Sequence, residues 1–225
     1  MRLMASGLAC VRSGREVFSA VDFSLAAGEA LLVLGRNGAG KSSLLRIIAG
    51  LVRISAGKLL LEGGAAELTL PEQAHYVGHH DAIKPALTVE ENLAFWARYL
   101  GGEAAAGGGP AGGDARDGVL AALDALALGD LAGLPAAYLS AGQRRRLSLA
   151  RLAAVKRPVW LLDEPTSALD TATQERLAGL MRRHLADGGI ILAATHGPIG
   201  LAGTKELRLA GAALAPGPAG PGDAA

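Results

Sequence analysis

The sequence contains a single cysteine, Cys10, so no disulfide bond can form within the chain. A chain without disulfides suits a reducing compartment, and Cys10 is expected to behave as a small apolar residue. No basic segment followed by an apolar stretch opens the sequence, so we expect no secretion signal. The longest uncharged apolar stretch, Gly188 to Thr204, contains Pro198 and is too short to span a bilayer. We therefore expect any contact with a membrane to be made through a partner.

An excess of charge is also absent. The chain has 22 Lys and Arg residues against 21 Asp and Glu residues, a formal net charge of +1. Proteins that bind nucleic acid usually carry a strong basic excess, so we expect no nucleic-acid partner. Half of the residues are hydrophobic and 19% are charged, which is typical of globular proteins. A chain of 225 residues without internal repeats fits one domain with room for a small subdomain.

The most specific motif begins at Gly35. Residues 30–34 are apolar, as expected of a buried parallel strand, and apolar residues at helical spacing follow Ser43. Between them stands the pattern G-x-x-x-x-G-K-S, and strand, glycine loop and helix together are the context of a phosphate-binding P-loop. The residues expected to bind nucleotide phosphates are Gly35, Arg36, Asn37, Gly38, Ala39, Gly40, Lys41, Ser42 and Ser43.

The chemistry of phosphate binding explains these residue types. Glycines let backbone N–H groups converge on phosphate oxygens, and the start of the following helix adds its positive dipole end. Lys41 is expected to reach the β- and γ-phosphates, and the Ser42 hydroxyl to ligate Mg²⁺. ATP and Mg²⁺ are therefore the expected ligands.

Two further apolar runs end in residues that suit this chemistry. Residues 159–162 lead into Asp163, expected to hold Mg²⁺, and Glu164, which can accept a proton from an attacking water. The alternative is a solvated acidic pair at the end of a strand. Residues 190–194 precede His196, which either senses the γ-phosphate or is an ordinary surface histidine.

A second anion-binding element follows from residues 139–143, which read LSAGQ and precede the helix-forming stretch 144–157. Ser140 suits the N-cap position, and a helix N-terminus attracts anions. A chain with a complete P-loop needs no second element on the same phosphates. We therefore expect this element to serve the ATP of a neighbouring subunit.

These residues resemble the ATP-binding cassette (ABC) proteins. LSAGQ is similar to their LSGGQ motif, and the order P-loop, LSAGQ, LLDEP, SALD and TH matches the family over roughly residues 5–210. The resemblance implies an α/β fold of the P-loop NTPase class, the ABC ATPase fold with a mixed-sheet core and a small helical subdomain. It also implies two copies joined head to tail, with Ser140, Gly142 and Gln143 on the partner copy's nucleotide. Glu164 would be the catalytic base, Asp170 an inter-subunit contact and His196 the switch residue.

The same resemblance divides the chain. Residues 1–86 and 135–210 are expected to form the nucleotide-binding core, and residues 87–134 the helical subdomain. Residues 101–113 and 211–225 are rich in glycine and lack apolar periodicity, which predicts a flexible insertion and a flexible tail. In the family the helical subdomain touches the membrane partner, so Thr88 to Leu100 is the candidate contact. The alternative is an amphipathic helix that packs on its own domain.

The chain departs from the family pattern at two positions. Arg12 stands where an aromatic residue usually stacks on adenine, and a guanidinium can also lie flat on the base. His79 stands where the family has a glutamine that contacts Mg²⁺. We therefore regard His79 as a candidate metal ligand, together with Ser42 and Asp163.

Residues 76–93 are similar to the corresponding loop of one branch of the family, the ATP-binding subunits that act in cytochrome c biogenesis and haem export. This resemblance implies an ATP-hydrolysing translocase subunit at the cytoplasmic face of the bacterial inner membrane, attached to integral membrane subunits. The alternatives are the ATPase of a different small-solute exporter and a soluble ABC ATPase that acts on nucleic acid or ribosomes. A P-loop kinase or GTPase is a further alternative, and it would lack the LSAGQ helix.

Overall fold

The structure is a computed structural model that describes residues 1–101 and 115–210. Apart from Gly101, the predicted glycine-rich insertion lies outside these residues, as does the predicted tail. Within the two described ranges, no helix is both long and apolar enough to cross a membrane.

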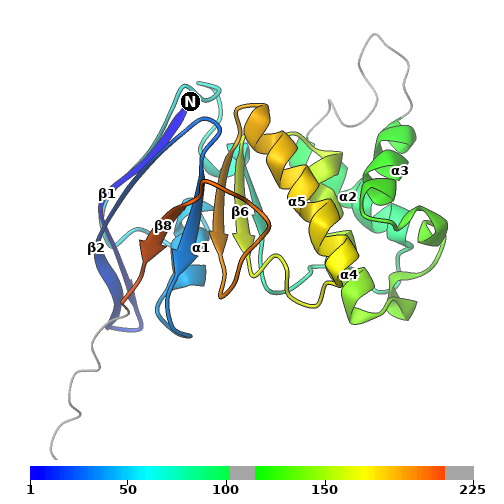
Figure 1. Cartoon of the computed structure of the whole chain (residues 1–225), viewed down its shortest axis with the longest axis horizontal. Helices are drawn as coiled ribbons and strands as arrows, with labels where there is room; N and C mark the ends of the chain where they lie inside the picture. Colours follow the sequence, from blue (N-terminus) through cyan, green and yellow to red (C-terminus); the bar gives the residue numbers. More distant parts are fainter. Residues whose placement is uncertain (102–114, 211–225) are drawn as a thin grey trace, which may run out of the picture.

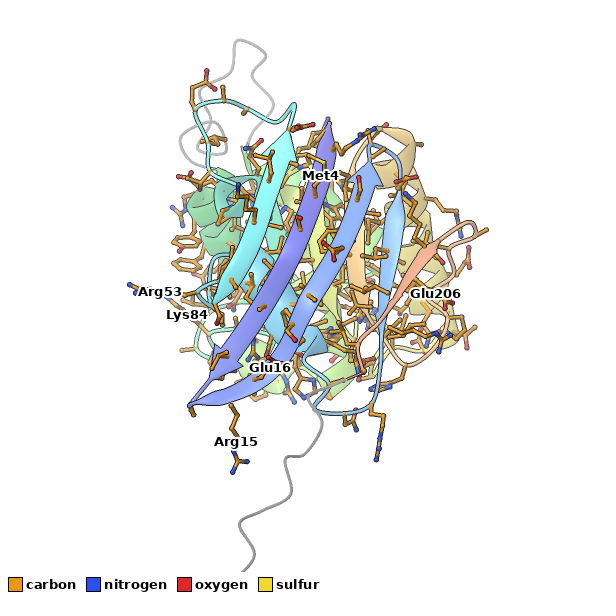
Figure 2. The ribbon with its side chains drawn as sticks, turned by 90° about the vertical axis from the view of Figure 1, so that its left-hand side faces the viewer. Met4, Arg15, Glu16, Arg53, Lys84 and Glu206 are labelled. Carbon is orange, nitrogen blue, oxygen red and sulfur yellow. The ribbon has the colours of Figure 1, made fainter. Side chains whose placement is uncertain are left out.

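The N-terminal part of the chain forms an antiparallel sheet in the order β2-β1-β4. Its strands are β1 (Arg2–Arg12), β2 (Arg15–Ala26) and β4 (Ala56–Glu62). Ser13 and Gly14, with φ of 49° and 74°, connect β1 to β2. Two residues with positive φ suit the tight turn that matches the twist of paired strands. Figure 2 shows this sheet face on, with Arg15 and Glu16 at the end of the β1–β2 hairpin.

A second sheet has five parallel strands in the order β5-β6-β7-β3-β8. Its strands are β3 (Ala30–Leu34), β5 (Ala74–Val77), β6 (Val159–Asp163), β7 (Ile190–Ala194) and β8 (Lys205–Arg208). Every residue of β6 and β7 is buried, as expected of strands covered on both faces. The strands predicted from the apolar runs at 30–34, 159–162 and 190–194 are confirmed. Because their carboxyl ends share one edge of the sheet, the residues that follow them are brought together.

Helix α1 (Lys41–Ile48) lies between the two sheets (Figure 1). Its Leu44, Leu45 and Ile48 are fully buried in one apolar cluster with residues of β1 and β6. Helices α4 (Ala141–Ala154) and α5 (Thr171–Ala186) belong to a second apolar cluster, which also contains Trp160 of β6. The parallel sheet is thus covered on both faces, and its buried strands position the residues that follow their carboxyl ends.

The helix after LSAGQ differs from its predicted range of 144–157. It begins at Ala141 and ends at Ala154, and Val155 is extended. The early start follows from a capping box, in which Ser140 and Gln143 satisfy each other's backbone N–H groups. The N-cap role predicted for Ser140 is confirmed.

Helices α2 (Val89–Gly101) and α3 (Ala115–Ala125) pack on each other and on α4, on the far side from the antiparallel sheet (Figure 1). Short 3-10 turns are found at Pro71–Gln73, Gly129–Leu131 and Ala136–Tyr138. The predicted boundaries of the helical subdomain at 87 and 134 stay a prediction.

Candidate nucleotide-binding site

Three glycines of the P-loop hold conformations that other residues rarely adopt. Gly35 has φ of 149°, Gly38 has φ of 80° and Gly40 has φ of 99°. A Cβ atom on Gly40 would lie 2.7 Å from Val17 Cγ1, and one on Gly35 would lie 2.6 Å from the carbonyl oxygen of Leu209. The loop can therefore close over a phosphate only if these positions carry no side chain.

The N-terminus of α1 opens into this loop. Gly40 is the N-cap, and the first turn consists of Lys41, Ser42 and Ser43. The backbone N–H groups of a first helical turn have no partner within their own helix, and the helix dipole makes this end positive. The loop and helix together form an anion-binding site.

The Lys41 side chain is held inside the loop, and the residue is only 7% exposed. Its Nζ donates to the carbonyl oxygens of Gly35, at 2.8 Å, and of Arg36, at 3.4 Å. Nζ also lies 3.1 Å from Nε2 of His196. The ammonium group is thus held at the loop by two carbonyl oxygens. When a nucleotide binds, phosphate oxygens can replace these carbonyl oxygens as its acceptors.

Ser42 and Asp163 join α1 to the end of β6. The Ser42 hydroxyl donates to Asp163 Oδ1 at 3.0 Å, while Asp163 Oδ2 is buried and has no hydrogen-bond partner. A buried, unpaired carboxylate oxygen beside a hydroxyl fits a hard cation such as Mg²⁺. Among the described residues there is no group of three or more His, Cys, Asp or Glu that could hold a metal. The two oxygens therefore suit a Mg²⁺ ion that keeps water and phosphate ligands, as Mg²⁺ usually does.

Tyr76 and Arg46 lie close to this pair. Arg46 Nε donates to the Tyr76 hydroxyl at 3.2 Å. Burial raises the pKa of Tyr76, so the phenol stays neutral.

Glu164 follows Asp163 and has an unusual backbone, with φ of 48°. Its Oε1 lies 3.4 Å from Nε2 of His196. One ring nitrogen of His196, Nε2, therefore lies near both the Lys41 ammonium and the Glu164 carboxylate. The structure brings together Lys41, Glu164 and His196, three residues that lie far apart in the sequence.

These residues surround a cavity of about 740 Å³. It is lined by every predicted phosphate-binding residue from Arg36 to Ser43, and also by Arg12, His79, Asp163, Glu164 and His196. Arg12 reaches it from the end of β1, and His79 from the loop after β5. Gly35 does not line the cavity but binds Lys41 through its carbonyl group.

Sequence reasoning missed three lining residues, Ser13, Val17 and Ser167. Ser13 and Val17 belong to the β1–β2 hairpin, whose position over the loop depends on packing between the two sheets. Ser167 had a local signal, since it is the first residue of SALD and stands three positions after Glu164. In the structure its N–H donates to the Glu164 carbonyl oxygen at 3.2 Å.

The remaining predicted residues lie elsewhere. Ser140, Gly142 and Gln143 stand at the start of α4 and do not line the cavity. Asp170 caps α5, where its Oδ1 accepts from the Thr173 N–H at 2.7 Å. This backbone hydrogen bond lowers the pKa of the exposed Asp170 carboxyl.

Comparison with known families gives one match over most of this region. The family described as ABC transporter matches residues 18–167. The cytochrome c biogenesis ATP-binding export protein CcmA of Nitrobacter winogradskyi is 61% identical over 213 residues, which cover 95% of this chain and all of the relative. The protein of the same name from Nitrobacter hamburgensis is 60% identical, over 94% of this chain and 99% of the relative.

Solved structures agree on the fold. A dimeric ATP-binding cassette in a post-hydrolysis state, bound to ADP and Pi, superposes with a TM-score of 0.73 and 24% identity. The match covers 87% of this chain and 88% of that one. The predicted ABC ATPase fold is confirmed.

Proposed function

This chain belongs to the ABC transporter family, and we propose that it is the ATP-hydrolysing subunit of an exporter that acts in cytochrome c biogenesis. The observation that carries the catalytic part is the arrangement of Lys41, Glu164 and His196 beside the Ser42–Asp163 pair. We infer the biological process from the names of the relatives, which match this chain over nearly their whole length.

The P-loop accounts for binding of ATP. The glycine backbone and the first turn of α1 hold phosphate oxygens, and Lys41 neutralises the charge of the β- and γ-phosphates. Ser42 and Asp163 would hold Mg²⁺, which neutralises phosphate charge when bound. Arg12, at the rim of the cavity, would cover the adenine ring with its guanidinium plane.

Glu164 accounts for hydrolysis. Its carboxylate lines the cavity and can accept a proton from a water that attacks the γ-phosphorus, while the bond to the β–γ bridging oxygen breaks. His196 lies within reach of both Lys41 and Glu164 and would orient that water or the γ-phosphate. His79 also lines the cavity and is a candidate contact to the metal.

We expect the start of α4 to bind the nucleotide of a second copy of the chain. Ser140, Gly142 and Gln143 form a helix N-terminus, yet they lie outside the cavity of their own chain. We expect them to bind the γ-phosphate held by the other copy, so that two chains close two sites head to tail. A chain that has no partner copy should bind ATP and hydrolyse it poorly.

A membrane partner would dock near α2. A groove of about 590 Å³ is lined by Trp96 and Tyr99 of α2 and by Leu51. Tyr99 is 72% exposed and Leu51 is 63% exposed, and exposed apolar side chains that gather in one groove are typical of interaction sites. The predicted contact at Thr88 to Leu100 includes this face. The chain would thereby sit on integral membrane subunits at the cytoplasmic face of the inner membrane and drive the handling of haem.

Replacing Glu164 with glutamine tests the catalytic assignment. The variant should bind ATP as tightly as the unmodified protein, because no P-loop contact changes. Its hydrolysis should fall about 10²- to 10⁴-fold, the usual worth of a general base. ATP binding and phosphate release would be measured on the complex with its membrane subunits. Glu175→Gln is the matched control, since Glu175 pairs with Arg182 on the exposed surface of α5. Near-normal hydrolysis by the Glu164 variant would disprove the role.

Affinity purification from detergent-solubilised membranes tests the partner. A stable complex with integral membrane proteins is the expected result, and recovery of ribosomes or nucleic acid would exclude a transporter. Loss of the gene should abolish covalent haem attachment to c-type cytochromes and leave b-type cytochromes intact. Normal assembly of c-type cytochromes would point to a different exported solute.

A further inference from the structure

Arg145 lies in the second turn of α4, and its side chain is directed into the protein. The residue is 5% exposed, although arginine is almost never buried without partners. It is not one of the residues that line the nucleotide cavity. A buried guanidinium so close to the cavity needs an explanation.

The partners of Arg145 belong to two segments on either side of the guanidinium group. Nη1 donates to the carbonyl oxygen of Gly78 at 2.7 Å and lies 3.4 Å from Asp81 Oδ1. Nη2 donates to the carbonyl oxygens of Asp163, at 2.7 Å, and Glu164, at 2.8 Å. One planar group thus connects α4 to the loop that carries His79 and to the end of β6. The rigid fork of arginine suits this bridge, because its two terminal nitrogens face different acceptors.

The contact with Glu164 falls on a strained piece of backbone. Glu164 has φ of 48°, in the left-handed region that residues with a side chain rarely occupy. Such a conformation persists only where its surroundings hold it, and it is common at active sites. The Glu164 N–H donates to the Ala194 carbonyl oxygen at 2.9 Å, and its own carbonyl oxygen accepts from Arg145 Nη2 at 2.8 Å and from the Ser167 N–H at 3.2 Å. Both peptide groups of Glu164 are therefore held by hydrogen bonds, the shortest of them from Arg145, and this constrains the direction of its side chain.

We propose that Arg145 is a positioning residue for ATP hydrolysis, which holds the Glu164 carboxylate and the His79 loop in register with each other. The proposal rests on the proposed role of Glu164 as the base. Arg145 is also close to the start of α4, where Ser140 is expected to meet the nucleotide of the second copy. Movement of α4 when the two copies close would therefore act directly on the backbone of Glu164.

Substitution of Arg145 should lower kcat and leave ATP binding unchanged. Substitution of a residue that orients a catalytic group without touching the substrate typically lowers activity about 10- to 100-fold. We expect Arg145→Gln to lower kcat by about that factor. The dissociation constant for ATP should stay within about twofold, because the P-loop, Lys41 and Ser42 do not contact Arg145. Arg145→Lys should recover part of kcat, since a single ammonium group can face only one of the two segments.

Arg146→Gln provides the matched control. Arg146 is the next residue of the same helix, and its Nη1 also donates to two carbonyl oxygens, those of Leu126 at 3.2 Å and Ala127 at 2.9 Å, which lie outside the site. This variant should lose stability in thermal unfolding and keep the kcat of the unmodified complex. The comparison separates the loss of an arginine that bonds carbonyl groups from the loss of the contact with Glu164.

A double variant gives a readout that a purely structural role would not change. If Arg145 acts through Glu164, adding Arg145→Gln to Glu164→Gln should lower the residual kcat less than about twofold. Multiplicative effects, equal effects of Arg145→Gln and Arg146→Gln on kcat, or a parallel loss of ATP affinity would each overturn the proposal. Should Arg145→Gln fail to fold, Arg145→Lys is the test. A lower kcat at unchanged ATP affinity would support the proposal, and an unchanged kcat would overturn it. Near-normal hydrolysis by Glu164→Gln alone would instead refute the proposed function.

Discussion

Acid should destabilise this protein through a buried histidine, His75 of β5. His75 is 1% exposed, and its Nε2 lies 2.7 Å from the carbonyl oxygen of Val155, just beyond α4. A carbonyl group only accepts, so Nε2 carries the proton of the neutral ring. Burial lowers the pKa of His75 to about 3, against the opposing effect of the Val155 carbonyl group. The positive charges of Arg157 and Arg151 act in the same direction as burial.

The sign of the effect follows from the two protonation states. Between pH 3 and 6.5 the unfolded chain binds a proton at His75 and the folded chain does not, so the free energy of unfolding decreases as the pH falls. This stabilisation is complete above pH 6.5 and is lost towards pH 3. For a pKa of about 6.5 in the unfolded chain, the loss between about pH 8 and pH 5 amounts to about 2 kcal/mol.

Urea unfolding at pH 8 and pH 5 would measure this loss. His75→Gln keeps a donor for the Val155 carbonyl group but cannot bind a proton, so its free energy of unfolding should decrease by about 2 kcal/mol less over this range. His80→Gln is the control, because His80 is exposed. Equal pH dependence of the unmodified protein and the His75 variant would refute the reasoning.

Two further substitutions test local structure at the site. Gly40→Ala should weaken ATP binding and cost about 1–3 kcal/mol of stability, since its Cβ would meet Val17 and Phe18 at a φ of 99°. Gly118→Ala in α3, where a Cβ meets nothing within 4 Å, should instead stabilise the protein by about 0.5–1 kcal/mol. Ser140→Ala removes the capping box of α4 and should cost about 1 kcal/mol in thermal unfolding. An unchanged melting temperature for Gly40→Ala or Ser140→Ala would contradict the corresponding contact.

Local patterns were enough to predict β3 with the glycine loop and helix that follow it, and the two other strands that end at the site, β6 and β7. The apolar runs at 30–34, 159–162 and 190–194 are strands because they are short, uncharged and followed by glycine or polar residues. The end of α4 was predicted three residues too late. Val155 is apolar and continues the helical pattern, but in the structure it is extended and its carbonyl group accepts from His75. That contact comes from a residue 80 positions away, which no local pattern includes.

The sequence by itself determined which chemical groups we propose for ATP: the glycines of the loop, Lys41, Ser42, and the carboxylates of Asp163 and Glu164 at the end of β6. Each of these depends on residue type and on neighbours a few positions away. Only the tertiary structure decided how they meet. The parallel order of β3, β6 and β7 places Lys41, Glu164 and His196 at one edge, and packing between the sheets sets the β1–β2 hairpin over the loop. The bridge made by Arg145 joins segments 67 and 19 residues away. Contacts at such separations form only when the whole core packs, because burial of apolar surface offsets the entropy lost in ordering the chain.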